Sequence, residues 1–106
     1  MTKERFPDSA MRTLFAAILA LETEAECQAF FTDLCTMSEL KSLSQRLMVA
    51  ALLRQQRTYG EITETTGVSA ATISRVSRAM NYGEEGYQLI LDRLVGCEVE
   101  KDAEIK

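Results

Sequence analysis

Apolar residues recur at helical spacing along most of the chain, and capping motifs divide them into separate segments. A first stripe begins after a candidate N-cap at Asp8 or Ser9 and reaches about Leu21. Thr23 and Glu26 then form a capping box, in which hydroxyl and carboxylate each accept a backbone N–H. The inward positions of these two predicted helices are Met11, Leu14, Phe15, Ile18, Leu21, Cys27, Phe30, Phe31 and Leu34.

A longer helix is predicted from a capping box at Thr36 and Glu39 to about Gln56. Ser38 is a competing cap. The helix begins with a one-sided stripe, but residues 47–53, LMVAALL, are apolar all round. A helix without a polar face is normally buried on every side. The first two helices of so small a chain can hardly cover it, so we expect a partner subunit there; the alternative is the central helix of a compact monomer.

The stretch 58–80, TYGEITETTGVSAATISRVSRAM, predicts a helix-turn-helix. Thr58 and Glu61 form a capping box that opens its first helix. Gly67 can end that helix in left-handed geometry, and Ser69 can cap the second helix. The positions expected to point inward are Ile62, Val68, Ile73 and Val76.

A last helix is expected from about Glu84 to Leu94, after a break at residues 81–83 whose asparagine and glycine suit left-handed geometry. The whole chain has 106 residues, with one proline, five glycines and few runs of β-branched residues. We therefore expect an all-α fold in a single domain over residues 1–106.

The ends of the chain, about 1–7 and 97–106, are expected to be flexible. The tail after Gly96 is charged and has little to bury; the alternative is that it extends the last helix. No stretch resembles a signal peptide or reaches the roughly 20 apolar residues of a membrane span. We expect a cytoplasmic protein that does not bind membranes. Its three cysteines, Cys27, Cys35 and Cys97, are then expected to be reduced.

The sequence lacks the residue patterns that catalytic and metal-binding sites usually require. There is no histidine, which removes the commonest general base, and the cysteine spacings fit no zinc pattern. A glycine-rich phosphate loop is missing, and a cysteine nucleophile would lack its usual partner. We therefore expect neither an enzyme nor a metal protein.

The net charge of −4 looks unsuitable for a nucleic-acid binder, but the charge is unevenly distributed. Residues 1–40 and 83–106 each carry three basic and seven acidic side chains. Residues 41–82 carry six basic side chains against Glu61 and Glu64, a net charge of +4. Positive charge is thus concentrated around the helix-turn-helix, as expected of a phosphate-contacting surface. The alternative is a solvated helix face that happens to be basic.

The outward face of the second helix of this motif is small and polar, so it can enter a DNA groove. Alanines at its start let the backbone approach base edges, and its hydroxyls and guanidinium groups can bond bases or phosphates. Arginines at the end of the long helix are candidates for flanking phosphates. The predicted DNA-binding residues are Ser69, Ala70, Ala71, Thr72, Ser74, Arg75, Arg78, Arg54 and Arg57.

The run from MSELKSLSQRLMVAALL to GVSAATISRVSRAMNYGEEGYQLILDRL resembles the Trp repressor superfamily, and most closely its YerC/YecD-like branch of uncharacterised regulators. The resemblance covers roughly residues 10–95. It implies six helices in an intertwined homodimer, with a joint core and a helix-turn-helix projecting on each side. It also implies that Ala70, Ala71, Thr72 and Ser74 face DNA.

Only some residues of the family's tryptophan site have counterparts in this sequence. Arg75 matches the arginine that stacks on the ligand's indole ring, and Arg46 resembles the arginine that contacts its carboxylate. Val76 stands where the repressor has a glycine and should occupy space that the indole needs. Ala79 replaces a serine that contacts the ligand amine. We expect no cofactor, and no response to tryptophan or another small effector.

The leading hypothesis is therefore a homodimeric, sequence-specific DNA-binding transcriptional regulator, and specifically a repressor, whose partner is double-stranded DNA. One rival is a helical dimeric protein-interaction module whose helix-turn-helix is only scaffold. Another is a sensor that still binds an amino acid at Arg46 and Arg75.

Overall fold

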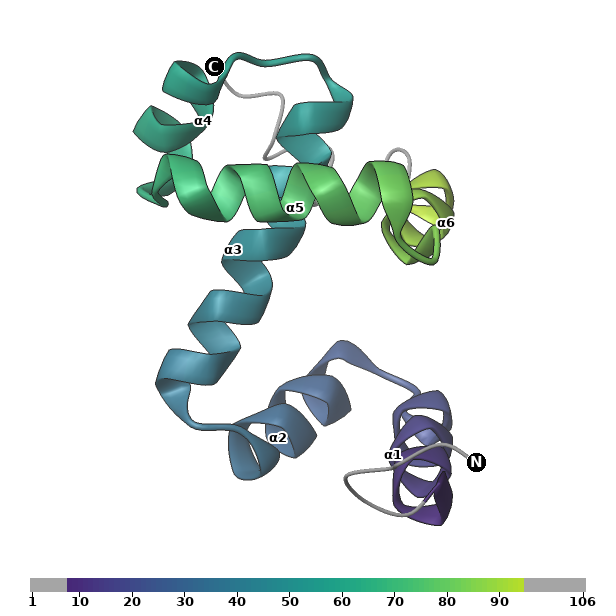
Figure 1. Ribbon diagram of the computed structural model, residues 1–106. Coiled ribbons are helices and arrows are strands. Elements are labelled where there is room, and N and C mark those ends of the chain that lie inside the picture. The colour runs from purple at the N-terminus through teal and green to yellow at the C-terminus, as the bar shows by residue number, and fades with distance from the viewer. Residues whose placement is uncertain (1–7, 95–106) are drawn as a thin grey trace. The chain divides into compact units, whose positions relative to one another are not determined.

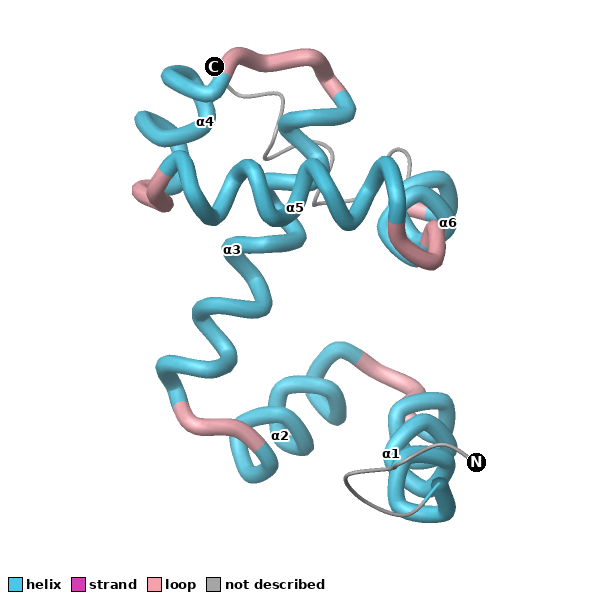
Figure 2. Tube along the Cα trace, viewed as in Figure 1, coloured by secondary structure: helices cyan, strands magenta, loops and turns pink. Residues whose placement is uncertain are grey.

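The computed structural model describes residues 8–94, where all regular structure is helical and the connections are short loops (Figures 1 and 2). The helices are α1 (Asp8–Ala20), α2 (Glu24–Leu34), α3 (Met37–Arg54), α4 (Tyr59–Thr66), α5 (Ala70–Tyr82) and α6 (Gly86–Arg93). The all-α fold with six helices is thereby confirmed. Cys97 and the predicted flexible ends lie outside the described residues.

The chain divides into two compact units, one ending at Leu40 and the other beginning at Lys41. The first contains α1, α2 and the start of α3, and the second contains the rest of the described chain. The single domain expected from the sequence stays a prediction.

Helices α1 and α2 of the first unit form near their predicted positions, yet neither buries a residue. Asp8 and Ser9, the candidate caps of the first helix, both lie within α1. Thr23 Oγ1 accepts the Glu26 N–H at 3.1 Å, as predicted, while the Glu26 carboxylate accepts the N–H of Glu22 at 2.8 Å. The apolar stripes remain open to solvent: Phe15 and Leu34 are both 52% exposed. These two helices thus leave apolar side chains uncovered within the first unit.

The core of the second unit forms where α5 lies across α3, with α4 near one end of α5 and α6 near the other (Figure 1). On α3, residues 49–52 have no exposed surface. They share the core with buried residues of the other three helices and of the turn between α4 and α5: Ile62, Val68, Ile73, Val76 and Leu91. All four predicted inward positions of the helix-turn-helix are therefore buried.

The all-apolar run of α3 is buried at its centre but not throughout. Leu47, Met48 and Leu53 pack against the core while keeping partial exposure. The prediction of complete burial is thus met within this chain only at residues 49–52.

The capping box of Thr36 and Glu39 starts α3 as predicted, with bonds of 2.8 and 3.0 Å. The helix ends at Arg54, two residues before the predicted end, because Gln56 turns the chain with φ 64°.

The break after α5 falls at the predicted place but has a different cause. Gly83 has φ −93° and is not left-handed. A Cβ there would collide with the carbonyl oxygen of Ala79, so the close approach of the backbone requires glycine. The left-handed residue is Glu85, with φ 67°, and it delays the start of α6 to Gly86. The predicted start at Glu84 was therefore two residues early.

Replacing Ile73 with alanine should lower the free energy of unfolding by about 2–5 kcal/mol, because it leaves a cavity in a fully buried position. Urea denaturation measures the change. Thr63→Ala, at an exposed position of α4, should change stability by less than about 0.5 kcal/mol. Equal effects from the two variants would contradict the assigned core.

Candidate nucleic-acid interface

The helix-turn-helix consists of α4 and α5, and its turn is held by the predicted local bonds. Thr58 Oγ1 accepts the Glu61 N–H at 3.1 Å, and Glu61 Oε1 accepts the Thr58 N–H at 2.9 Å. Gly67 ends α4 with φ 81°, and its N–H bonds to the Thr63 carbonyl. Ser69 Oγ then accepts the Thr72 N–H at 3.2 Å and starts α5. Each predicted cap of this motif is thus confirmed.

The outward face of α5 carries most of the predicted DNA-binding residues. Those that are exposed are Ser69, Ala70, Ala71, Ser74, Arg75 and Arg78. Thr72 is half-buried, and its hydroxyl lies 3.3 Å from the Ser69 hydroxyl. Ser69 and Thr72 are therefore partly engaged in capping the helix, while the alanines and arginines are open to a ligand.

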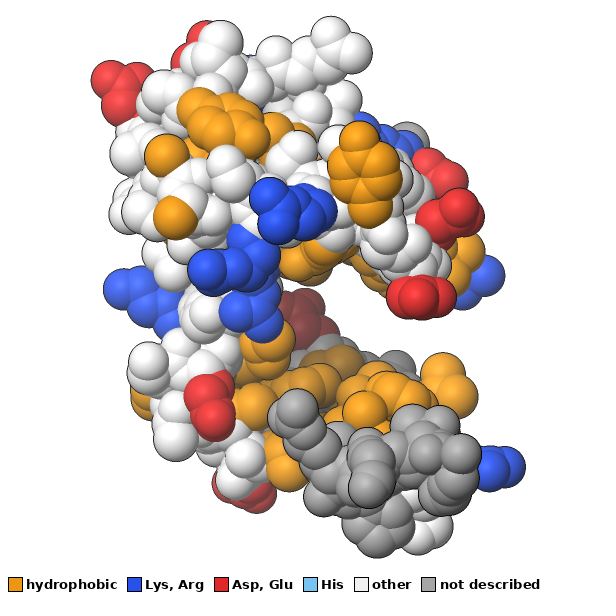
Figure 3. Space-filling model, in the orientation of Figure 1, with side chains coloured by type: hydrophobic (Ala, Val, Ile, Leu, Met, Phe, Trp, Pro, Cys, Tyr) orange, Lys and Arg blue, Asp and Glu red, His pale blue; other side chains and the backbone are white. Residues whose placement is uncertain are grey.

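Basic side chains gather where α5 crosses α3, as Figure 3 shows for this face of the molecule. Acidic side chains on the same face of this unit lie over α4 and α6, away from the crossing (Figure 3). Basic side chains are thus gathered on this face, in agreement with the positive charge expected of residues 41–82. Such a surface attracts a polyanion despite the net negative charge of the chain.

Arg46 and Arg75, the two candidate ligand-binding residues, line one hollow between α3 and α5. Its volume is about 190 Å³, and its other lining residues are Ser42, Gln45, Val68 and Thr72. Arg46 Nη1 donates to Ser42 Oγ at 3.0 Å. The hollow is polar and carries two guanidinium groups, so it suits an anionic group, either of a small molecule or of a DNA phosphate.

Val76 and Ala79 do not line this hollow. Val76 is 2% exposed and packs into the core, and Ala79 is exposed on α5. The expectation that Val76 occupies the space of an indole ring therefore stays a prediction.

Arg54, predicted to contact flanking phosphates, has a partner within the chain. Its Nη2 lies 2.7 Å from Asp92 Oδ1, and its Nη1 donates to the Gln88 carbonyl at 3.5 Å. This ion pair ties the end of α3 to α6. Arg57, the other predicted flanking residue, is half-buried. Phosphate binding by either arginine stays a prediction, and for Arg54 it would compete with Asp92.

Gln45 was not predicted from the sequence to be a functional residue, but in the structure it connects two helices. Its Nε2 donates to the Thr66 carbonyl at 3.2 Å, linking α3 to the end of α4. Only the fold brings these residues, 21 positions apart, together, and no sequence pattern marks the pair.

Two further findings concern the described residues as a whole. Residues 8–94 contain no cluster of three or more side chains suited to hold a metal ion. Within the same range no helix is long and apolar enough to cross a membrane.

The chain is similar to known proteins over nearly all of its described length. Residues 9–95 match the family model described as Trp repressor protein. The chain is 50% identical over 90 residues to YerC of Bacillus subtilis, described as uncharacterized, and the match covers 85% of this chain and 86% of YerC. A crystal structure of a TrpR-like protein from Eubacterium eligens is similar with a TM-score of 0.81 at 51% identity, covering 85% of this chain and 93% of that one. A Trp repressor candidate from Staphylococcus aureus gives a TM-score of 0.81 at 49% identity, with coverages of 84% and 89%.

Gly67→Ala should destabilise the fold by about 1 kcal/mol, because alanine is strained at φ 81° although nothing lies within 4 Å of the added Cβ. Gly60→Ala is the matched control. Gly60 lies in α4 with room for a methyl group, so alanine there should stabilise by roughly 0.5 kcal/mol. Thermal unfolding of both variants checks the sign; a stabilising Gly67→Ala would refute the left-handed turn.

Proposed function

Because this chain belongs to the Trp repressor protein family, we propose that it is a sequence-specific DNA-binding transcriptional regulator that acts as a repressor. The family is one of DNA-binding regulators and not of enzymes. The observation that carries the proposal is the exposed face of α5, where small residues precede Arg75 and Arg78 on a well-packed helix-turn-helix.

The start of α5 is the part of the helix that enters the major groove. Ala70 and Ala71 are exposed and have only methyl side chains, so the helix backbone can approach the base edges closely and contact thymine methyl groups. Arg75 and Arg78, further along the same exposed face, bond bases or phosphates. Phosphate contacts give affinity and hold the helix in register, and the base contacts select the sequence.

The regulator acts as a homodimer. Support comes from the apolar stripes of α1 and α2, which bury no residue in a single chain, and from the exposed Leu43 of α3. A second copy would cover these surfaces. Each copy would contribute one reading head, which is the helix-turn-helix formed by α4 and α5. Two reading heads related by a twofold axis would then bind a near-palindromic operator whose half-sites lie about one helical turn, or roughly 34–36 Å, apart.

Binding to DNA does not require tryptophan in this proposal. Arg46 and Arg75 share a hollow. Ala79, however, stands where the Trp repressor has a serine that contacts the ligand amine, and an alanine side chain cannot form that hydrogen bond. The arginines are then available to phosphate oxygens. The parent protein is accordingly expected to bind its operator in buffer without any amino acid.

The double variant Arg75→Ala, Arg78→Ala should bind a selected operator at least about tenfold more weakly, because it loses two charged contacts. The slope of log affinity against log salt concentration should become shallower by about 2 if both arginines contact phosphates, since fewer counterions are released. Fluorescence anisotropy at several salt concentrations measures both quantities. Arg12→Ala removes one exposed charge from α1 and should leave affinity nearly unchanged.

The rival hypothesis is a protein-interaction module whose helix-turn-helix is only scaffold and does not bind DNA, and it predicts a different result. In that case neither heparin nor random DNA should retain the parent at low salt. An operator selected in vitro that binds the double variant as tightly as the parent would show that α5 is not the reading helix.

Phe15→Glu should convert the dimer to monomer, because Phe15 belongs to the apolar stripe that a second copy would cover. Thr13→Glu, on the opposite face of α1, is the control and should leave the dimer intact. Light scattering coupled to size-exclusion chromatography should give twice the 11.9 kDa chain mass for parent and control. A monomeric parent at micromolar concentration would refute the dimer.

A further inference from the structure

The carbonyl of Thr66 lies at the turn between the two helices of the reading head. Thr66 is the last residue of α4, directly before the left-handed Gly67 that turns the chain towards α5. The turn has internal bonds of its own: the Thr66 hydroxyl donates to the Ile62 carbonyl at 2.7 Å and accepts the Val68 N–H at 3.3 Å. These bonds define the shape of the turn, but they all lie within residues 62–68 and do not place the turn relative to α3.

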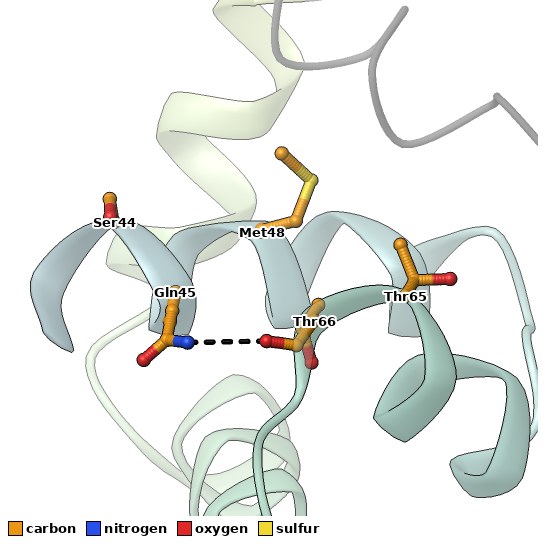
Figure 4. A pocket seen from close by; sticks show the side chains of 5 residues that line it. All are labelled: Ser44, Gln45, Met48, Thr65 and Thr66. Carbon is orange, nitrogen blue, oxygen red and sulfur yellow. Dashed lines mark hydrogen bonds between the residues drawn. The ribbon is translucent and has the colours of Figure 1, made fainter. Parts of the chain in front are cut away.

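Gln45 supplies a polar link from α3 to this turn. Figure 4 shows its side chain pointing from α3 towards the end of α4, where Nε2 donates to the Thr66 carbonyl at 3.2 Å. Carbonyls at a helix end lack partners within the helix and need a donor from elsewhere. The bond is part-buried, so water competes less well for the carbonyl than at an open surface.

Gln45 lines two hollows, while Val68 of the same turn is buried in the core with α3. On one side is the hollow that contains Arg46 and Arg75. On the other is a hollow of about 350 Å³ lined by Ser44, Gln45, Met48, Thr65 and Thr66 (Figure 4). Gln45 is the residue common to both linings.

We propose that Gln45 is a positioning residue for DNA binding, which sets the orientation of the reading head through its hydrogen bond to the Thr66 carbonyl. This inference rests on the proposed function. Helix α5 begins four residues after Thr66, so a shift of the turn moves the exposed Ala70 and Ala71 directly. The two heads of a dimer must engage both half-sites at once, and an error in head orientation therefore costs affinity for the operator.

The test compares Gln45→Leu with Ser44→Ala in the full-length protein. Leucine keeps much of the side-chain volume but cannot donate a hydrogen bond. Ser44 is the neighbour of Gln45 on α3, and its hydroxyl donates to the Lys41 carbonyl of the same helix at 2.9 Å. Gln45→Leu should weaken binding to a selected operator about tenfold, the product of roughly threefold at each of two heads. Ser44→Ala should bind as the parent does.

Two readouts distinguish positioning from direct contact or general damage. Affinity for random DNA and the salt slope should not change in Gln45→Leu, because the same phosphates are contacted. The dependence of affinity on half-site spacing should broaden, since the heads are less firmly held. An equal loss of affinity for operator and random DNA would overturn the proposal in favour of a direct contact.

A measurement without DNA tests the link itself. Hydrogen exchange should become faster for the amides of residues 65–69 in Gln45→Leu, while the amides of α2 keep the parent rates. Unchanged exchange at the turn, or an operator affinity and spacing profile equal to those of the parent, would overturn the positioning role and leave the proposed function intact. Failure of the parent itself to bind DNA would overturn both.

Discussion

The core that α3 shares with the helix-turn-helix is the constraint on which the rest of the second unit depends. Ala50 and Ala51 at its centre have no exposed surface. Ile62 of α4 and Ile73 of α5 fill the space around them in the same core cluster. Because both helices of the motif share one core with α3, the exposed face of α5 lies on a packed base, and Gln45 adds a directional link to it.

Hydrogen bonds and ion pairs between helices then define the relative orientation of these helices more precisely than apolar packing does. Hydrophobic contacts are non-directional, whereas a hydrogen bond or ion pair has a narrow range of distance and angle. Gln45 connects α3 to the end of α4, and Arg54 connects the other end of α3 to Asp92 of α6. The ion pair is partly exposed and contributes modestly to stability, so its main effect is on the placement of α6.

Local signals in the sequence were reliable here because they concern residues three or four positions apart. The capping boxes at Thr36 and Thr58, the cap at Ser69 and the left-handed Gly67 all appear where the sequence placed them. Errors arose where a distant or backbone contact decided the outcome. The sequence marked Gly83 as a break but not its approach to the Ala79 carbonyl, and it gave no reason to expect a left-handed Glu85.

The sequence by itself determined the helical segments, the inward positions of the motif and the basic character of residues 41–82, because periodicity, capping and charge are local properties. Tertiary structure decided which polar groups meet. It paired Arg54 with Asp92, placed Arg46 and Arg75 around one hollow, and joined Gln45 to Thr66. A side chain three or four bonds long can reach many partners, and only the packing of the helices selects one. For this reason the sequence predicted the reading helix, and the fold identified the residue that we propose orients it.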